Sequence, residues 1–133
     1  GREHVVRAVL EGVAHRGADL VDAAVADAGV DIATVRIDGG MSRNPTFAQA
    51  LADATARPVE VAPIAESTTL GAAFMAGLGV GVWRYLHDID DLGQPAQVVE
   101  PRAGIDLASQ RERWHDALDR AAGWHSELSA LDF

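Results

Sequence analysis

The segment VRIDGGMSRNP at residues 35–45 constrains the fold of this chain more than any other feature. Apolar and polar residues alternate over residues 34–38, which predicts a short β-strand. Two glycines follow, and Pro45 suits the first turn of a helix because no backbone donor is lost there. Either Ser42 or Asn44 can cap this helix. The segment therefore predicts a strand that ends in a glycine turn and leads directly into a helix.

The rest of the pattern predicts an α/β fold with few strands. The expected elements are a helix at 4–28 closed by Gly29, a strand at 34–38, a helix to about 56, a strand at 57–62, a helix from about 66 to 78, an irregular segment at 79–107 and a helix at 108–129. Two strands cannot form a sheet with both faces buried, so further strands are expected from sequence outside this chain. We expect the chain to be an excised piece of a longer protein.

Several helical positions predict close packing. Gly12 and Gly17 lie inside the first helix, where glycine costs about 1 kcal/mol against alanine, so we expect either tight packing or a kink there. The helix at 66–78 is thin enough to approach another backbone closely, because small residues fill it: Gly71, Ala72, Ala73, Ala76 and Gly77. One face of the last helix is expected to pack against the rest, through Trp114, Leu118, Ala121 and Trp124.

Composition excludes several classes of function. The net charge of −9 predicts a surface that repels nucleic acid and anionic lipid, so neither is an expected partner. The chain has no cysteine, which removes disulfides, thiolate metal sites and a cysteine nucleophile. The longest apolar stretch, residues 70–83, is too short to span a membrane, and no signal-like segment opens the chain. A cytoplasmic protein is expected.

The glycine turn itself predicts a ligand site. Glycine removes Cβ, so Gly39 and Gly40 expose bare backbone at the carboxyl end of a strand, where open α/β sheets bind ligands. The helix that follows adds unpaired N–H donors and a positive dipole end. These features favour a nucleotide across the two glycines, with Ser42, Arg43 and Asn44 as the nearest polar groups. The alternative is a plain tight turn, since neither GxGxxG nor GxxxxGK[ST] is present.

Other polar residues carry weaker signals. The acidic loop of Asp88, Asp90 and Asp91 is interpreted as solvated rather than as a cation site. No paired metal spacing relates the five histidines, His4, His15, His87, His115 and His125. No metal-binding residue is assigned.

The remaining candidates are interpreted as structural. Trp114 and Trp124 are expected to pack rather than to stack on bases, because no basic stripe accompanies them. Glu66 is expected to supply favourable charge at a helix N-terminus, and Ser67 and Thr68 are expected to be caps rather than nucleophiles. No catalytic residue is assigned.

These motifs resemble a known family. IDGGMSRNP is similar to the adenosine motif of the sugar kinase, actin and heat-shock chaperone superfamily, and ESTTLGAAFMAG at 66–77 resembles the segment that follows it. The best match is to the FGGY carbohydrate kinases, and within them to the glycerol kinases, over residues 3–125. It runs through LEGVAHRGADLVDAAV, RIDGG, RPVEVAPIAESTTLGAAFMAGLGVGVW and the tryptophan spacing of the tail.

The resemblance implies an actin-like, ribonuclease H-like ATPase fold, with residues 1–133 as the C-terminal segment of its nucleotide-binding domain. By position, Gly40 and Asn44 match family residues beside ATP, and Gly39 belongs to the same turn. The implied cofactors are ATP or ADP and Mg²⁺. The catalytic aspartate, the Mg²⁺ ligands and the pocket for a polyol or sugar are expected upstream, on a lobe absent here. A homo-oligomer is possible, and the chain alone is expected to be inactive.

Three alternatives stay open. Asp38 before the glycines favours a glycerol kinase, while Met41, Ser42, Arg43 and Pro45 depart from the usual glycerol kinase turn. The chain could therefore belong to an FGGY kinase for a pentose or a deoxy sugar, of the xylulose, ribulose or fucose type. A non-catalytic nucleotide switch and a simple association module are the other two, and the tail tryptophans argue against the switch.

Overall fold

The described part of the chain contains four α-helices and three short strands. A computed structural model describes residues 1–122, apart from the side chains of residues 91–93. The helices are α1 (Arg2–Ala28), α2 (Pro45–Thr55), α3 (Ser67–Gly79) and α4 (Leu107–Ala122), and the strands are β1 (Val35–Ile37), β2 (Val59–Val61) and β3 (Gln97–Val99). Short 3-10 turns cover Gly40–Arg43 and Leu86–Gly93. These bounds confirm the expected order of the helices and of the first two strands.

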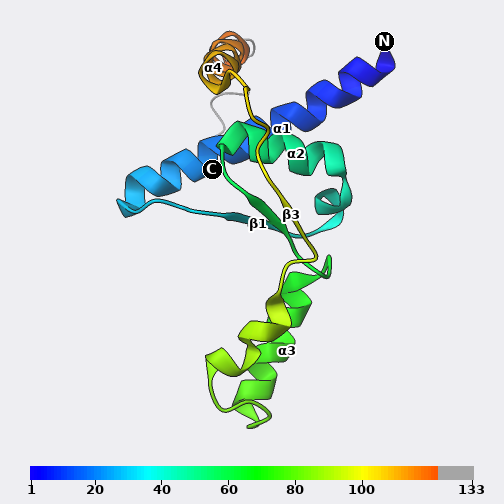
Figure 1. The fold of residues 1–133 in the computed structure, drawn as a ribbon, viewed down its shortest axis with the longest axis vertical. Helices are drawn as coiled ribbons and strands as arrows, with labels where there is room; N and C mark the ends of the chain where they lie inside the picture. Colours follow the sequence, from blue (N-terminus) through cyan, green and yellow to red (C-terminus); the bar gives the residue numbers. More distant parts are fainter. Residues whose placement is uncertain (123–133) are drawn as a thin grey trace.

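The strands form one sheet in the order β1-β2-β3. β1 and β2 are parallel, with Val35 opposite Val59, and β2 and β3 are antiparallel, with Val59 opposite Val99. Parallel neighbours need a crossover connection, which α2 provides between β1 and β2. In Figure 1, α2 lies over the sheet, and α1 crosses behind α2.

Helix α2 is the central layer of the molecule. Its buried residues include Phe47, Leu51 and Ala52, and these form one core with Ala14 of α1 and Val59 of β2. Val59 is fully buried. A helix covered on two sides must carry apolar or small residues around most of its circumference. The alanines of α2 meet this requirement, because they let α1 and the sheet approach it from opposite sides.

The expectation of tight packing is confirmed for Gly17 but not for Gly12, where an added methyl group would make only an ordinary contact. A Cβ on Gly17 would lie 2.9 Å from Cδ1 of the buried Leu51, whereas a Cβ on Gly12 would lie 3.7 Å from the ring of Trp114. Gly29 ends the helix in the left-handed conformation at φ 65°, as expected of a glycine at this position.

The expectation of an irregular segment at 79–107 is wrong in part. β3 lies within it and pairs with β2, and the backbone N–H of Ala96 also donates to the carbonyl of Val61 at 2.9 Å. β3 is only three residues long and follows Pro95, so local alternation gives no strand signal. Its pairing depends on the exposed edge of β2, a tertiary feature.

Helix α4 is tied to α1 through Asp19. The Asp19 carboxylate accepts hydrogen bonds from Trp114 Nε1 at 2.9 Å, from Arg111 and from His115. Burial would raise the pKa of Asp19, but these hydrogen bonds outweigh it and lower the pKa to about 2. The Trp114 ring also stacks on His15, with centroids 5.5 Å apart. The packing role of Trp114 is confirmed, whereas Trp124 and His125 lie outside the described residues.

Helix α3 projects away from the sheet (Figure 1). Gly77 is buried against the ring of Trp83, which also meets Phe74 edge-on at 5.6 Å. Among residues 1–122, no other helix or strand packs extensively on α3, so its expected close approach to another backbone stays a prediction. None of the described helices is both long and apolar enough to cross a membrane.

The different surroundings of Gly12 and Gly17 predict opposite effects of the same substitution. Gly12→Ala should stabilise the chain by up to about 1 kcal/mol, since alanine is the better helix former and the added methyl has room. Gly17→Ala should lose this gain and destabilise by roughly 1 kcal/mol, because Leu51 must move within a packed core. Urea unfolding of both variants measures the difference, and equal effects would contradict the packing described for α1 on α2.

Candidate functional site

The glycine turn lies at the carboxyl ends of the two parallel strands. Asp38, Gly39 and Gly40 follow β1 directly. The backbone N–H of Gly39 donates to the carbonyl of Ala65 at 3.1 Å, and that of Ala62 donates to the carbonyl of Ile37 at 2.9 Å. The segments that leave β1 and β2 therefore run side by side, at the edge of an open α/β sheet where ligands bind.

The two glycines differ in their backbone. Gly39 has φ 82° and ψ 179°, a conformation that side chains with a Cβ rarely adopt. Gly40 has no such restriction. A Cβ built on either residue would have no other atom within 4 Å. The turn thus exposes backbone to open space, which a flat ligand could contact.

Ser42 is buried under the glycine turn and stabilises it by hydrogen bonds. It is only 5% exposed, and its hydroxyl donates to the carbonyl of Gly39 at 2.7 Å while its backbone N–H donates to the same oxygen at 3.2 Å. The hydroxyl proton is therefore used within the turn. This burial distinguishes Ser42 from its neighbour Arg43, which is exposed and whose side chain makes no hydrogen bond or ion pair with the side chains and backbone that the structure describes.

Asn44 is the cap of α2, which decides between the two residues that the sequence allowed. Its Oδ1 accepts the backbone N–H groups of Thr46 at 3.0 Å and of Phe47 at 3.3 Å, and Pro45 occupies the first helical position. Because the oxygen is engaged, the side-chain NH₂ group of Asn44 is what remains for a ligand.

The expectation that Ser67 and Thr68 cap α3 is wrong. The cap position is Glu66, which makes no side-chain cap hydrogen bond. The backbone N–H of Ser67 instead donates to Oδ2 of Asp38 at 3.2 Å. The carboxylate at the end of β1 therefore satisfies a helix N-terminus that lies 29 residues further along the chain.

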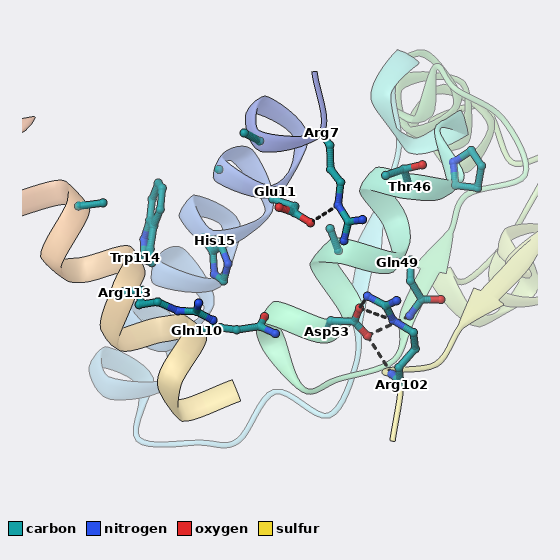
Figure 2. A pocket seen from close by; sticks show the side chains of 15 residues that line it. Arg7, Glu11, His15, Thr46, Gln49, Asp53, Arg102, Gln110, Arg113 and Trp114 are labelled. Atoms are coloured by element: carbon teal, nitrogen blue, oxygen red, sulfur yellow. Dashed lines mark hydrogen bonds and ion pairs between the residues drawn. The ribbon is translucent and has the colours of Figure 1, made fainter. Parts of the chain in front are cut away.

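A separate cavity of about 740 Å³ lies among α1, α2 and α4. Figure 2 shows that its charged residues are largely paired with one another. Arg7 donates to Glu11 at 2.6 Å, and Arg102 pairs with the buried carboxylate of Asp53 at 2.6 Å. Burial would raise the pKa of Asp53, but the hydrogen bonds from Arg102 lower it. None of the five residues predicted for nucleotide binding lines this cavity.

The acidic loop at 87–91 has a structural role in its described part. Asp88 accepts the backbone N–H groups of Arg84 at 2.9 Å and of Tyr85 at 3.0 Å. These two bonds lower the pKa of Asp88. The side chain of Asp91 lies outside the described residues. No group of three or more metal-ligating side chains is found in the part of the chain that the structure describes.

Comparison with known proteins assigns the family. A family model for the C-terminal domain of FGGY carbohydrate kinases matches residues 1–80, more than half of the chain. The chain belongs to the FGGY family of carbohydrate kinases. The matched residues include the glycine turn, α2 and all of α3.

Individual kinases and solved kinase structures are also similar to this chain. A glycerol kinase of Koribacter versatilis is 41% identical over 122 residues, which cover 91% of this FGGY chain and 24% of the relative. A crystal structure of Plasmodium falciparum glycerol kinase with ADP matches with a TM-score of 0.79 at 34% identity, over 90% of this chain and 24% of that one. Gluconate kinase from Lactobacillus acidophilus matches with a TM-score of 0.73 at 21% identity, over 97% of this chain and 26% of that one.

These matches confirm the predicted fold. The helices and the small sheet have the arrangement found in FGGY kinases, which share the actin-like ATPase fold. The chain spans about a quarter of the length of the relatives that it matches.

Sequence reasoning missed two features of this region. The contact between Asp38 and Ser67 joins residues far apart in the chain, and only the carboxylate preceding the glycines could have suggested it. No sequence pattern indicates the cavity beside α2, because the cavity depends on how α4 packs against α1.

The capping role of Asn44 can be tested by measuring the stability of Asn44 variants. Asn44→Ala should destabilise the chain by about 1 kcal/mol, because two backbone donors of α2 lose their acceptor. Asn44→Asp keeps an oxygen acceptor at the cap and should retain most of the stability. Urea unfolding measures the free energy of unfolding of both variants. Equal losses of stability in the two variants would contradict a capping role.

Proposed function

We propose that this chain is the C-terminal, nucleotide-binding segment of a longer ATP-dependent kinase that phosphorylates glycerol or a related polyol. The observation that carries this proposal is the open glycine turn at the carboxyl ends of two parallel strands, in a chain of the FGGY family. Such a turn accepts a flat, partly charged ligand against its main chain.

Each residue of the turn has a distinct role in this proposal. Gly39 and Gly40 form a wall of bare backbone for the adenosine, and Ser42 holds the carbonyl of Gly39 in place. Asn44 offers its side-chain NH₂ group, since its oxygen caps α2. Arg43 supplies an exposed positive charge that no carboxylate of the described residues pairs with, which would favour an anionic nucleotide.

The reacting groups are proposed to lie elsewhere in the longer protein. Phosphoryl transfer needs a base for the attacking hydroxyl and Mg²⁺ to neutralise charge on the phosphates. No step of the reaction is assigned to the described residues, among which no group of three or more metal-ligating side chains is found. The contribution of this chain is therefore to bind and orient ATP or ADP, in a kinase that would work in the cytoplasm.

Glycerol is the proposed phosphoryl acceptor because relatives named glycerol kinase reach 41% identity. A second acceptor class is a sugar or sugar acid, since kinases named for gluconate and xylulose share the fold at 21% and 22% identity. A non-catalytic nucleotide switch is the third possibility on this fold.

Turnover by the full-length protein tests the proposal. We expect ADP release from Mg-ATP in the presence of glycerol, and little with pentoses, pentitols or gluconate. ADP release with only one of the sugars would support the kinase activity but replace glycerol with that sugar as the phosphoryl acceptor. Absence of turnover with every acceptor would contradict the proposed kinase activity and favour the switch.

Substitution of Gly40 tests the proposed contact with the nucleotide. Gly40→Val should weaken ADP binding by the full-length protein at least tenfold without unfolding it, because the new side chain enters space that is open in the free protein. Gly40→Ala should have a smaller effect of the same sign. Isothermal titration with ADP measures both.

Gly79→Val is the matched control for this test, since Gly79 also has open space around it and lies at the far end of α3. We expect its ADP affinity to equal that of the wild type. If the Gly40→Val variant binds ADP with wild-type affinity, the proposal that the glycine turn contacts the nucleotide is contradicted.

A further inference from the structure

Helix α3 is joined to the rest of the described molecule at one junction. Figure 1 shows it leaving the sheet at the end of β2 and extending away from α1 and α2. No other element within residues 1–122 packs extensively against it. Its placement relative to the glycine turn therefore depends on the few contacts at its N-terminus.

Two of these contacts come from adjacent residues of the turn. The backbone N–H of Gly39 donates to the carbonyl of Ala65 at 3.1 Å. The carboxylate of Asp38 accepts the backbone N–H of Ser67 at 3.2 Å. One contact precedes the helix and the other lies within its first turn, so together they restrict both the position and the tilt of α3 at the turn.

The cap of α3 comes from outside the helix. A helix is normally capped by a side chain at its own start, and such a cap stabilises the helix alone. Glu66 occupies that position in α3 and makes no side-chain cap bond. The acceptor comes instead from the end of β1, and its negative charge also suits the positive end of the helix dipole. A cap supplied by a distant segment ties the helix to that segment.

We propose that Asp38 is a positioning residue for nucleotide binding, because its carboxylate holds the first turn of α3 against Gly39 and Gly40. The proposal rests on the function proposed above. The glycine turn and the start of α3 then act as one wall of the nucleotide site, with the main-chain conformation of Gly39 fixed from both sides. In this proposal Asp38 acts through α3 and is assigned no contact with a reacting group.

The test uses the full-length protein with two substitutions at Asp38. Asp38→Ala removes the acceptor and should raise the dissociation constant for ADP by about threefold to tenfold, the loss expected for one such hydrogen bond. Asp38→Asn keeps an oxygen that can accept the Ser67 N–H, so its dissociation constant should stay within about threefold of the wild type. In turnover, Asp38→Ala should raise KM for ATP and leave kcat within about twofold.

Asp31→Ala is the matched control. Asp31 is an exposed aspartate that precedes β1 and pairs with Arg57, so its removal changes the net charge equally at the opposite end of the strand. Its ADP affinity should equal that of the wild type. Hydrogen exchange of the peptide covering residues 62–70, measured without nucleotide, gives a readout independent of ADP. Exchange should be faster in Asp38→Ala and unchanged in Asp38→Asn and Asp31→Ala.

The outcomes separate this proposal from the function on which it rests. Wild-type ADP affinity in Asp38→Ala would overturn the positioning role and leave the nucleotide site intact. Equal losses in Asp38→Ala and Asp38→Asn, or a fall in kcat with unchanged KM, would also overturn it. Failure of the wild type to bind ADP would overturn both proposals, and the exchange rates would then report only whether Asp38 holds α3.

Discussion

The rest of the structure depends on the burial of α2 between α1 and the sheet. Two-sided burial requires small and apolar residues around most of α2, and it lets Gly17 approach Leu51 so closely that an added methyl group would displace the Leu51 side chain. Because α2 also connects the parallel strands β1 and β2, its position sets their register. The start of α2 is thereby fixed relative to the ends of both strands.

The glycine turn is a consequence of this arrangement. The chain must leave β1 and enter α2 within seven residues, from Asp38 to Asn44. The positive φ of Gly39, the buried hydroxyl of Ser42 and the cap by Asn44 accomplish this. These residues stabilise the turn from the core side, which leaves the backbone on the other side open. The same residues that close the fold thus create the surface proposed for adenosine.

Sequence periodicity and turn chemistry predicted the four helices, two of the strands and the glycine turn, because each has a local signal. β3 had none, since three residues gain their strand conformation by pairing with β2. The choice between Ser42 and Asn44 as the cap required the actual path of the turn. The cap from Asp38 to Ser67 was not predicted, because local patterns place a cap beside the helix that it serves.

A nucleotide is proposed to lie against the backbone of Gly39 and Gly40. Photolabelling of the full-length protein with 8-azido-ATP, followed by peptide mapping, tests this placement. We expect the label within the turn or the first residues of α2, between residues 38 and 49, and we expect excess ADP to abolish it. Labelling confined to other peptides, or labelling that ADP does not compete away, would contradict the account.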